Sequence, residues 1–136
     1  MVETTLEIIE TIDSKKFTSH VVKEYYDVIR ELITVILLLD GYKTHGEGAH
    51  KKLIEYIEKN YAEFKVHDIM LIDDLRIIRN KISYNGFFVT DDFLERKRKD
   101  ILMLINALKI IIYKKLWSEG LTIIDLDKHF YLQKYG

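Results

Sequence analysis

Arg79, Asn80 and Tyr84 bring a cation, an amide and a titratable hydroxyl into one short segment of the chain. An arginine guanidinium binds phosphate through a planar fork of N–H donors and stabilises charge that develops in a transition state. Asn80 can orient a phosphate or a neighbouring side chain. A tyrosine hydroxyl, with a pKa near ~10, is a poor base at neutral pH, but it donates hydrogen bonds and can act as a weak acid. These groups suit chemistry on a phosphodiester that needs no metal ion.

The segment 75–84 is predicted to form the last turns of an amphipathic helix. Apolar residues recur at helical spacing, and polar residues four positions apart share another face. The apolar positions are Leu75, Ile78 and Ile82, and the polar positions are Arg76, Asn80 and Tyr84. Asn85-Gly86, directly after this segment, is typical of a helix end.

This pattern resembles the signature of the HEPN family, in which an arginine and a polar residue are followed, about three residues later, by a histidine. The resemblance implies a helical bundle and a metal-independent endoribonuclease site, built where two motif helices meet across a homodimer. Arg79 matches the arginine and Asn80 the polar residue. Tyr84 stands where the family has histidine, so we expect weak cleavage or none. The alternative is that Arg79 and Asn80 only bond to a loop or cap a helix, while Tyr84 packs.

Residues around the motif extend the expectation of an RNA site. Arg76 and Lys81 are expected to hold the RNA backbone, because cations supply most of the affinity for phosphates. Phe87 and Phe88 follow the motif directly and are expected to stack on bases. Their alternative role is a hydrophobic plug over the end of the bundle, since phenylalanine is usually buried.

His45 and His50 flank a glycine-rich turn that also contains Glu47. Imidazole and carboxylate groups bind metals, but the two histidines lack the i, i+4 spacing of a helical zinc site and have no evident third ligand. We therefore expect no metal and no cofactor. The plainer interpretation is that Gly46 and Gly48 let the chain turn into the next helix. His50 is the reserve proton-transfer residue, for the case that this loop closes over the motif.

The composition is that of a globular protein with one domain, residues 1–136. Of the 136 residues, 48% are hydrophobic and 32% charged, which excludes a disordered chain. The absence of cysteine excludes disulfides and thiolate metal sites. The formal net charge of −1 gives no general basic field, so non-specific affinity for nucleic acid is not expected. The sequence shows no leader pattern and no membrane-spanning run, and we expect a cytoplasmic protein.

The absence of proline and the helical spacing of apolar residues predict an all-α fold. We expect an up-and-down antiparallel four-helix bundle with a short N-terminal helix and a C-terminal extension. Its core should cover about 18–117, and its tail 121–136. Thr18 or Ser19 is expected to cap the first bundle helix, Gly41 to end it, and Asp68 to cap the third. The predicted helices cover about 3–12, 18–40, 48–60, 68–84 and 90–117.

Together, the pattern and the resemblance predict an RNA-directed homodimer, a toxin-antitoxin or defence-associated ribonuclease with weak or lost activity. The helices at 18–40 and 90–117 are apolar on more than one face, which favours a subunit contact. The alternative is a non-catalytic helical dimer that serves as an interaction module for a partner such as a nucleotidyltransferase. A ribonuclease requires Arg79 and Tyr84 to be exposed in a shared cleft, whereas a silent module can have them bonded to protein.

Overall fold

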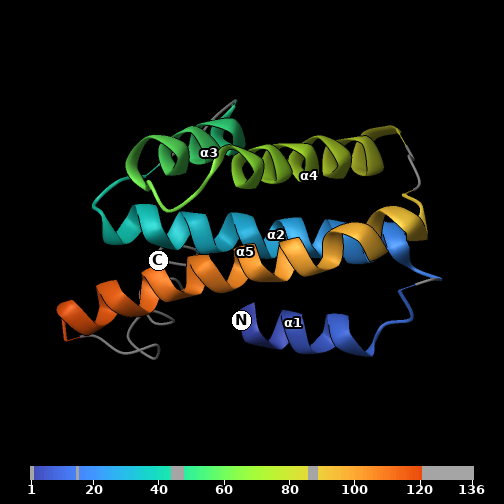
Figure 1. Cartoon of the computed structure of the whole chain (residues 1–136), viewed down its shortest axis with the longest axis horizontal. Coiled ribbons are helices and arrows are strands. Elements are labelled where there is room, and N and C mark those ends of the chain that lie inside the picture. The colour runs from blue at the N-terminus through green and yellow to red at the C-terminus, as the bar shows by residue number, and fades with distance from the viewer. Residues whose placement is uncertain (1, 15, 44–47, 86–88, 121–136) are drawn as a thin grey trace.

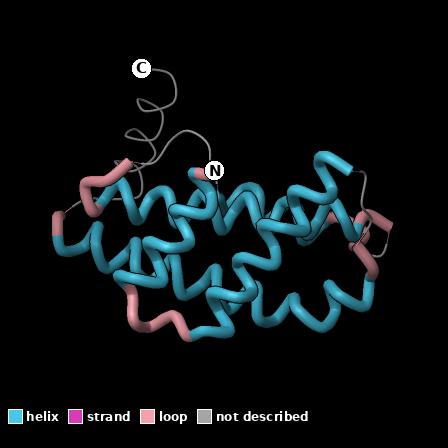
Figure 2. Tube along the Cα trace, turned by 90° about the horizontal axis from the view of Figure 1, so that it is seen from above, coloured by secondary structure: helices cyan, strands magenta, loops and turns pink. Residues whose placement is uncertain are grey.

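The described part of the chain is entirely helical. The computed structural model describes residues 2–14, 16–43, 48–85 and 89–120, and no strand occurs among them (Figure 1 and Figure 2). The helices are α1 (Val2–Thr11), α2 (Thr18–Leu39), α3 (Ala49–Asn60), α4 (Val66–Asn85) and α5 (Asp91–Ser118). The all-α prediction is therefore confirmed. The predicted tail, residues 121–136, lies outside the described residues.

Helix α2 is the centre of the molecule. It packs against each of the other four helices, with α3 and α4 on one side and α1 on the other in Figure 1. Its side chains are buried over more than half of its circumference, with Val28 and Val35 on one side, Ile29 in the middle and Tyr26 on the other, each at most 2% exposed. Central packing therefore explains why this helix is apolar on more than one face, and no subunit contact is needed to account for it.

Helices α2 and α5 lie side by side and run in the same direction. At their first residues, the Ser19 hydroxyl accepts a hydrogen bond from the Val89 N–H at 2.8 Å. At their last residues, the Lys115 ammonium pairs with the Asp40 carboxylate. An up-and-down bundle would place opposite ends of these helices together, so the predicted antiparallel order is wrong for this pair.

Helix α3 also runs parallel to α2. Its first turn carries His50, whose ring lies 6.0 Å from that of Tyr26 in the first half of α2. Its last turns carry Tyr56, whose hydroxyl bonds to Asp40 at the end of α2. The physical reason is the connection between them: about nine extended residues can span ~30 Å, enough to return along α2 before α3 begins.

The helix ends agree only partly with prediction. Gly41 ends α2 as expected, with φ 88°, and the Tyr42 N–H bonds to the Leu37 carbonyl at 2.8 Å in a Schellman-type turn. Two predicted caps are wrong. Phe17, not Thr18 or Ser19, stands at the N-cap of α2. Helix α4 begins at Val66 instead of at Asp68.

The three polar residues that were expected to cap helices make other contacts at helix starts. Thr18 and Ser19 bond to Asp91 and Val89 respectively and hold the start of α5 against α2. The Asp68 carboxylate accepts the Lys65 N–H at 2.9 Å, which satisfies a donor just before the first turn of α4. None of the helices in the described ranges combines the length and the apolarity that crossing a membrane requires.

Candidate phosphate-binding site

Three arginines from two helices form a cluster between α2 and α4, here named the arginine cluster: Arg30, Arg76 and Arg79. Arg30 lies on α2, and the other two lie three residues apart on α4, so they share one face of that helix. Arg76 and Arg79 have side chains only 20% and 22% exposed. Cations that are partly shielded from water act on a bound anion more strongly than cations in bulk solvent do.

Nearby acids pair with two of the three arginines. The Nε of Arg76 donates a hydrogen bond to Asp73 Oδ1 at 2.9 Å. Asp27 lies on α2, and its Oδ1 is 3.3 Å from the Nε of Arg79. The geometry is that of an ion pair without a hydrogen bond, since both atoms are buried and neither has a hydrogen-bond partner. The Nε of Arg30 is likewise buried without a partner. Buried N–H groups of this kind gain free energy when an acceptor such as a phosphate oxygen reaches them.

His50 lies at the edge of the arginine cluster. Burial lowers the pKa of its imidazole, and the charges of Arg30 and Arg79 lower it further, against an opposing effect of Asp27. Its ring contacts that of Tyr26, with the ring planes tilted by 45°. The pKa shift favours the neutral imidazole at neutral pH, and a neutral imidazole can accept a proton.

Tyr26 forms the buried floor beside this histidine. Its side chain is 1% exposed, and burial raises its pKa to about 12, although the three nearby arginines act in the opposite direction. Its phenol therefore stays protonated at neutral pH, so it can donate a hydrogen bond but does not act as a base. The arrangement offers cations for a phosphate, one neutral base and one fixed phenol.

The structure brings together some of the predicted site residues. Arg79, Arg76 and the reserve residue His50 lie near enough to one another that both arginines lower the pKa of the imidazole. Asn80 lies on the same helix and is partly buried, and Lys81 is exposed. Tyr84 lies in the last turn of α4, but its side chain is outside the described residues, as are Phe87 and Phe88.

Sequence reasoning missed Asp27 and Arg30, and it considered Tyr26 only as a possible base-stacking residue. They lie on α2, about fifty residues before the motif, and contact it only through the fold. The sequence carried only a weak signal, because Asp27 and Arg30 are two of five charged residues on α2, with Lys23, Glu24 and Glu31. Charged residues on a central helix require partners, which the arginines of α4 and Asp27 provide in part.

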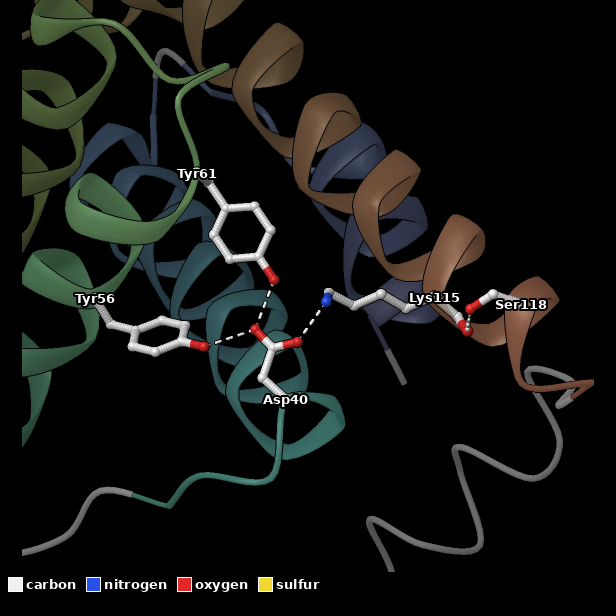
Figure 3. A network of polar contacts seen from close by, with 5 residues as sticks. All are labelled: Asp40, Tyr56, Tyr61, Lys115 and Ser118. Carbon is white, nitrogen blue, oxygen red and sulfur yellow. Dashed lines mark hydrogen bonds and ion pairs between the residues drawn. The ribbon is translucent and has the colours of Figure 1, made fainter.

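A second polar network, also missed, ties the ends of α3 and α5 to the C-terminal end of α2 (Figure 3). Asp40 Oδ2 accepts hydrogen bonds from the hydroxyls of Tyr56 at 2.7 Å and Tyr61 at 2.6 Å. Its other oxygen pairs with Lys115 of α5. The Lys115 ammonium also lies over the Tyr61 ring, 5.4 Å from its centroid. Because the carboxylate has its donors, this network is structural.

The pKa shifts in this network agree with a structural role. Burial alone would raise the pKa of Asp40, but the hydrogen bonds from Lys115, Tyr61 and Tyr56 outweigh burial and lower it. Burial and the bond to Asp40 raise the pKa of Tyr56. For Lys115, the bonds to Asp40 and Tyr61 outweigh burial and raise the pKa. Each group is therefore held in its usual charge state at neutral pH.

A cavity of about 530 Å³ between α1 and α5 is less suited to a phosphate. Arg98 lines it, and its buried Nε has no hydrogen-bond partner. Three glutamates of α1 line the same cavity and repel an anion: Glu3, Glu7 and Glu10. Among the described residues there is also no group of three His, Asp or Glu side chains placed to hold a metal ion.

Comparison of the chain with protein-family models, curated proteins and solved structures finds no match.

Proposed function

We propose that the protein acts on RNA as a HEPN-like, metal-independent endoribonuclease of low activity, in a toxin-antitoxin or defence setting. The observation that supports this most strongly is the arginine cluster with His50 at its edge. It brings the motif arginine, Arg79, next to a proton acceptor that the motif itself lacks. Phosphate binding and proton transfer are the two requirements of RNA cleavage without a metal.

The chemistry assigns one role to each group. His50 accepts the proton of the ribose 2′-hydroxyl, and the 2′-oxygen attacks the adjacent phosphorus. The bond from phosphorus to the 5′-oxygen breaks, and that oxygen takes a proton from Tyr84. The products are a 2′,3′-cyclic phosphate and a free 5′-hydroxyl. Arg79 holds the phosphate and Asn80 orients it.

Further residues hold the RNA around the reacting phosphate. Arg76 and Lys81 contact neighbouring phosphates, and Phe87 and Phe88 stack on bases. Tyrosine is a weak acid at neutral pH, so the leaving oxygen is protonated slowly and the rate stays low.

The test compares Arg79→Ala, Arg79→Lys and Tyr84→His in an RNA cleavage assay with excess chelator. Both Arg79 variants should lose RNA binding or cleavage, even Arg79→Lys, because lysine lacks the planar fork. Tyr84→His should raise cleavage, because it supplies an acid that titrates near neutrality. If the Tyr84→His protein folds and binds RNA, but neither it nor the natural protein cleaves RNA, catalysis is refuted and an RNA-binding surface remains.

The second candidate is a non-catalytic interaction module, a helical dimer that docks a protein partner such as a nucleotidyltransferase. The ion pair between Arg79 and Asp27 favours it, because this pair gives the motif arginine a structural role between α4 and α2. In that case Arg79→Ala and Asp27→Asn should lower thermal stability, and RNA binding should be absent from the natural protein. Thermal unfolding and RNA binding measured on the same samples separate the two candidates.

A further inference from the structure

The outer face of α5 exposes an apolar stripe, here named the α5 stripe: Leu102, Met103, Asn106, Ile110, Tyr113 and Trp117. Trp117 is 88% exposed and Met103 62%. The opposite face of α5 packs on α2 through buried residues such as Ile101 and Leu108. Large apolar side chains gathered on one exposed helix face mark an interaction surface.

The spacing along the α5 stripe indicates what kind of element covers it. Five of its residues, from Met103 to Trp117, follow one another at alternating steps of three and four. This seven-residue repeat keeps one face of a helix in continuous contact with another helix. Asn106 is the polar position in the repeat, and a single polar residue at such a seam sets the register of a helix pair.

We propose that the α5 stripe binds the α5 stripe of a second copy of this chain, with the two helices antiparallel about a two-fold axis at Ile110. This axis places Ile110 opposite itself and Met103 opposite the partner copy's residue 117. A methionine thioether packs favourably against an aromatic ring. The arrangement is self-complementary, as an interface between identical subunits must be.

The size of the α5 stripe suits a dimer. The exposed parts of its apolar side chains amount to roughly 600 Å² per copy, given that a large aromatic side chain contributes ~150–250 Å² when buried. A standard interface buries about 800 Å² per partner. The stems of flanking lysines such as Lys114 can supply the difference, because their methylene groups cover apolar surface.

Helix α4 offers a smaller rival surface. Its exposed apolar residues are Val66, Met70 and Ile77, at 76%, 59% and 39% exposure, and none of them is aromatic. Pairing through α4 would bring two copies of the motif together. Pairing through α5 leaves each arginine cluster within its own chain, with His50 supplied by the same chain. A dimer through the α5 stripe therefore does not depend on the proposed RNA chemistry.

The first experiment measures oligomeric state by light scattering at 5–50 μM, a range set by ~10⁻⁶ M affinities. The natural protein should be a dimer, and Ile110→Lys should be a monomer, because it places two ammonium groups opposite each other on the axis. A matched pair of variants, Met103→Lys and Met70→Lys, changes equally exposed methionines on α5 and α4. Only Met103→Lys should weaken the dimer. Circular dichroism confirms that each variant is folded.

The second experiment uses the absence of cysteine from the chain. Ile110→Cys should cross-link two copies through a short bis-maleimide. Met103→Cys should not, because its two copies would lie about 21 Å apart along the antiparallel helices, whereas the double variant Met103→Cys with Trp117→Cys should. A monomeric natural protein, with the stripe covered by residues 121–136 or left open, overturns the proposal. So does loss of the dimer in Met70→Lys alone, or cross-linking by Met103→Cys alone.

Discussion

At the scale of single residues, His50 and Asp40 show how position sets the use of a titratable group. His50 lies beside cations and is partly buried, so its pKa is lowered and its neutral form is favoured. Asp40 receives three donors, so its pKa is lowered and its charged form is favoured. The first arrangement leaves a group available for proton transfer, and the second holds three elements together.

The pH dependence of RNA cleavage should reveal His50. The rate should rise with pH as the imidazole loses its proton, and the midpoint of this rise should lie below the ordinary histidine pKa of about 6.5. In His50→Gln this rise of the rate from acid to neutral pH should disappear, together with most of the activity. NMR titration of the imidazoles checks the same pKa without relying on catalysis. If the rate of His50→Gln still rises with pH as in the natural protein, another group transfers the proton.

Asp40→Asn should lower the free energy of unfolding at pH 7 by about 1–3 kcal/mol, because it weakens the pair with Lys115 and disturbs two tyrosine bonds. The pKa of Asp40 is lowered in the folded state. Its stabilising effect is therefore present above the unfolded pKa near ~3.9 and is lost as pH falls through the folded value. Urea unfolding at several pH values measures this, and the gap between Asp40→Asn and the natural protein should shrink in acid. Asp92→Asn, at an exposed site, is the control.

At the scale of elements, the parallel course of α2 and α3 brings His50 to the candidate site. The start of α3 returns to the first half of α2, and this places His50 near Tyr26 and Arg30. An antiparallel α3 would carry the histidine to the far end of the molecule. The sharp end of α2 at Gly41 makes this return possible, because the chain must leave the helix axis at once.

Substitutions at Gly41 should show the cost of this helix end. Its φ of 88° is unfavourable for side chains, while nothing lies within 4 Å of an added Cβ. Gly41→Ala should therefore lower the free energy of unfolding by about 1–2 kcal/mol through backbone strain alone. Gly41→Asn should cost less, since asparagine tolerates this region. Thermal unfolding of both variants tests the order, and equal losses would point to a contact instead of strain.

At the scale of the whole molecule, the net charge of −1 supplies no general positive field, so the RNA binding that we propose should depend on the arginine cluster. We expect few phosphate contacts and a shallow dependence on salt. For three contacts with single-stranded RNA, the slope of log K against log salt should be about −2.

Arg30→Gln should make that slope shallower by about 0.7, the value for one phosphate. Lys59→Gln changes a lysine at the far end of α3 and should leave the slope unchanged. Fluorescence anisotropy with a labelled oligonucleotide measures both. A steep slope, near that expected for six or more contacts, would show that RNA binds over a wider surface than the cluster.

The sequence by itself determined the local features of this protein. The five helices follow from apolar spacing and the absence of proline, and Gly41 and Thr90 mark helix ends because their effects act within one turn. The pairing of Arg76 and Arg79 on one face is also local, since three residues are less than one helical turn. The tertiary structure alone decided the direction of α3 and α5, the meeting of His50 with the motif, and the network around Asp40. These depend on how a loop returns and which faces pack, and sequence periodicity carries no record of either.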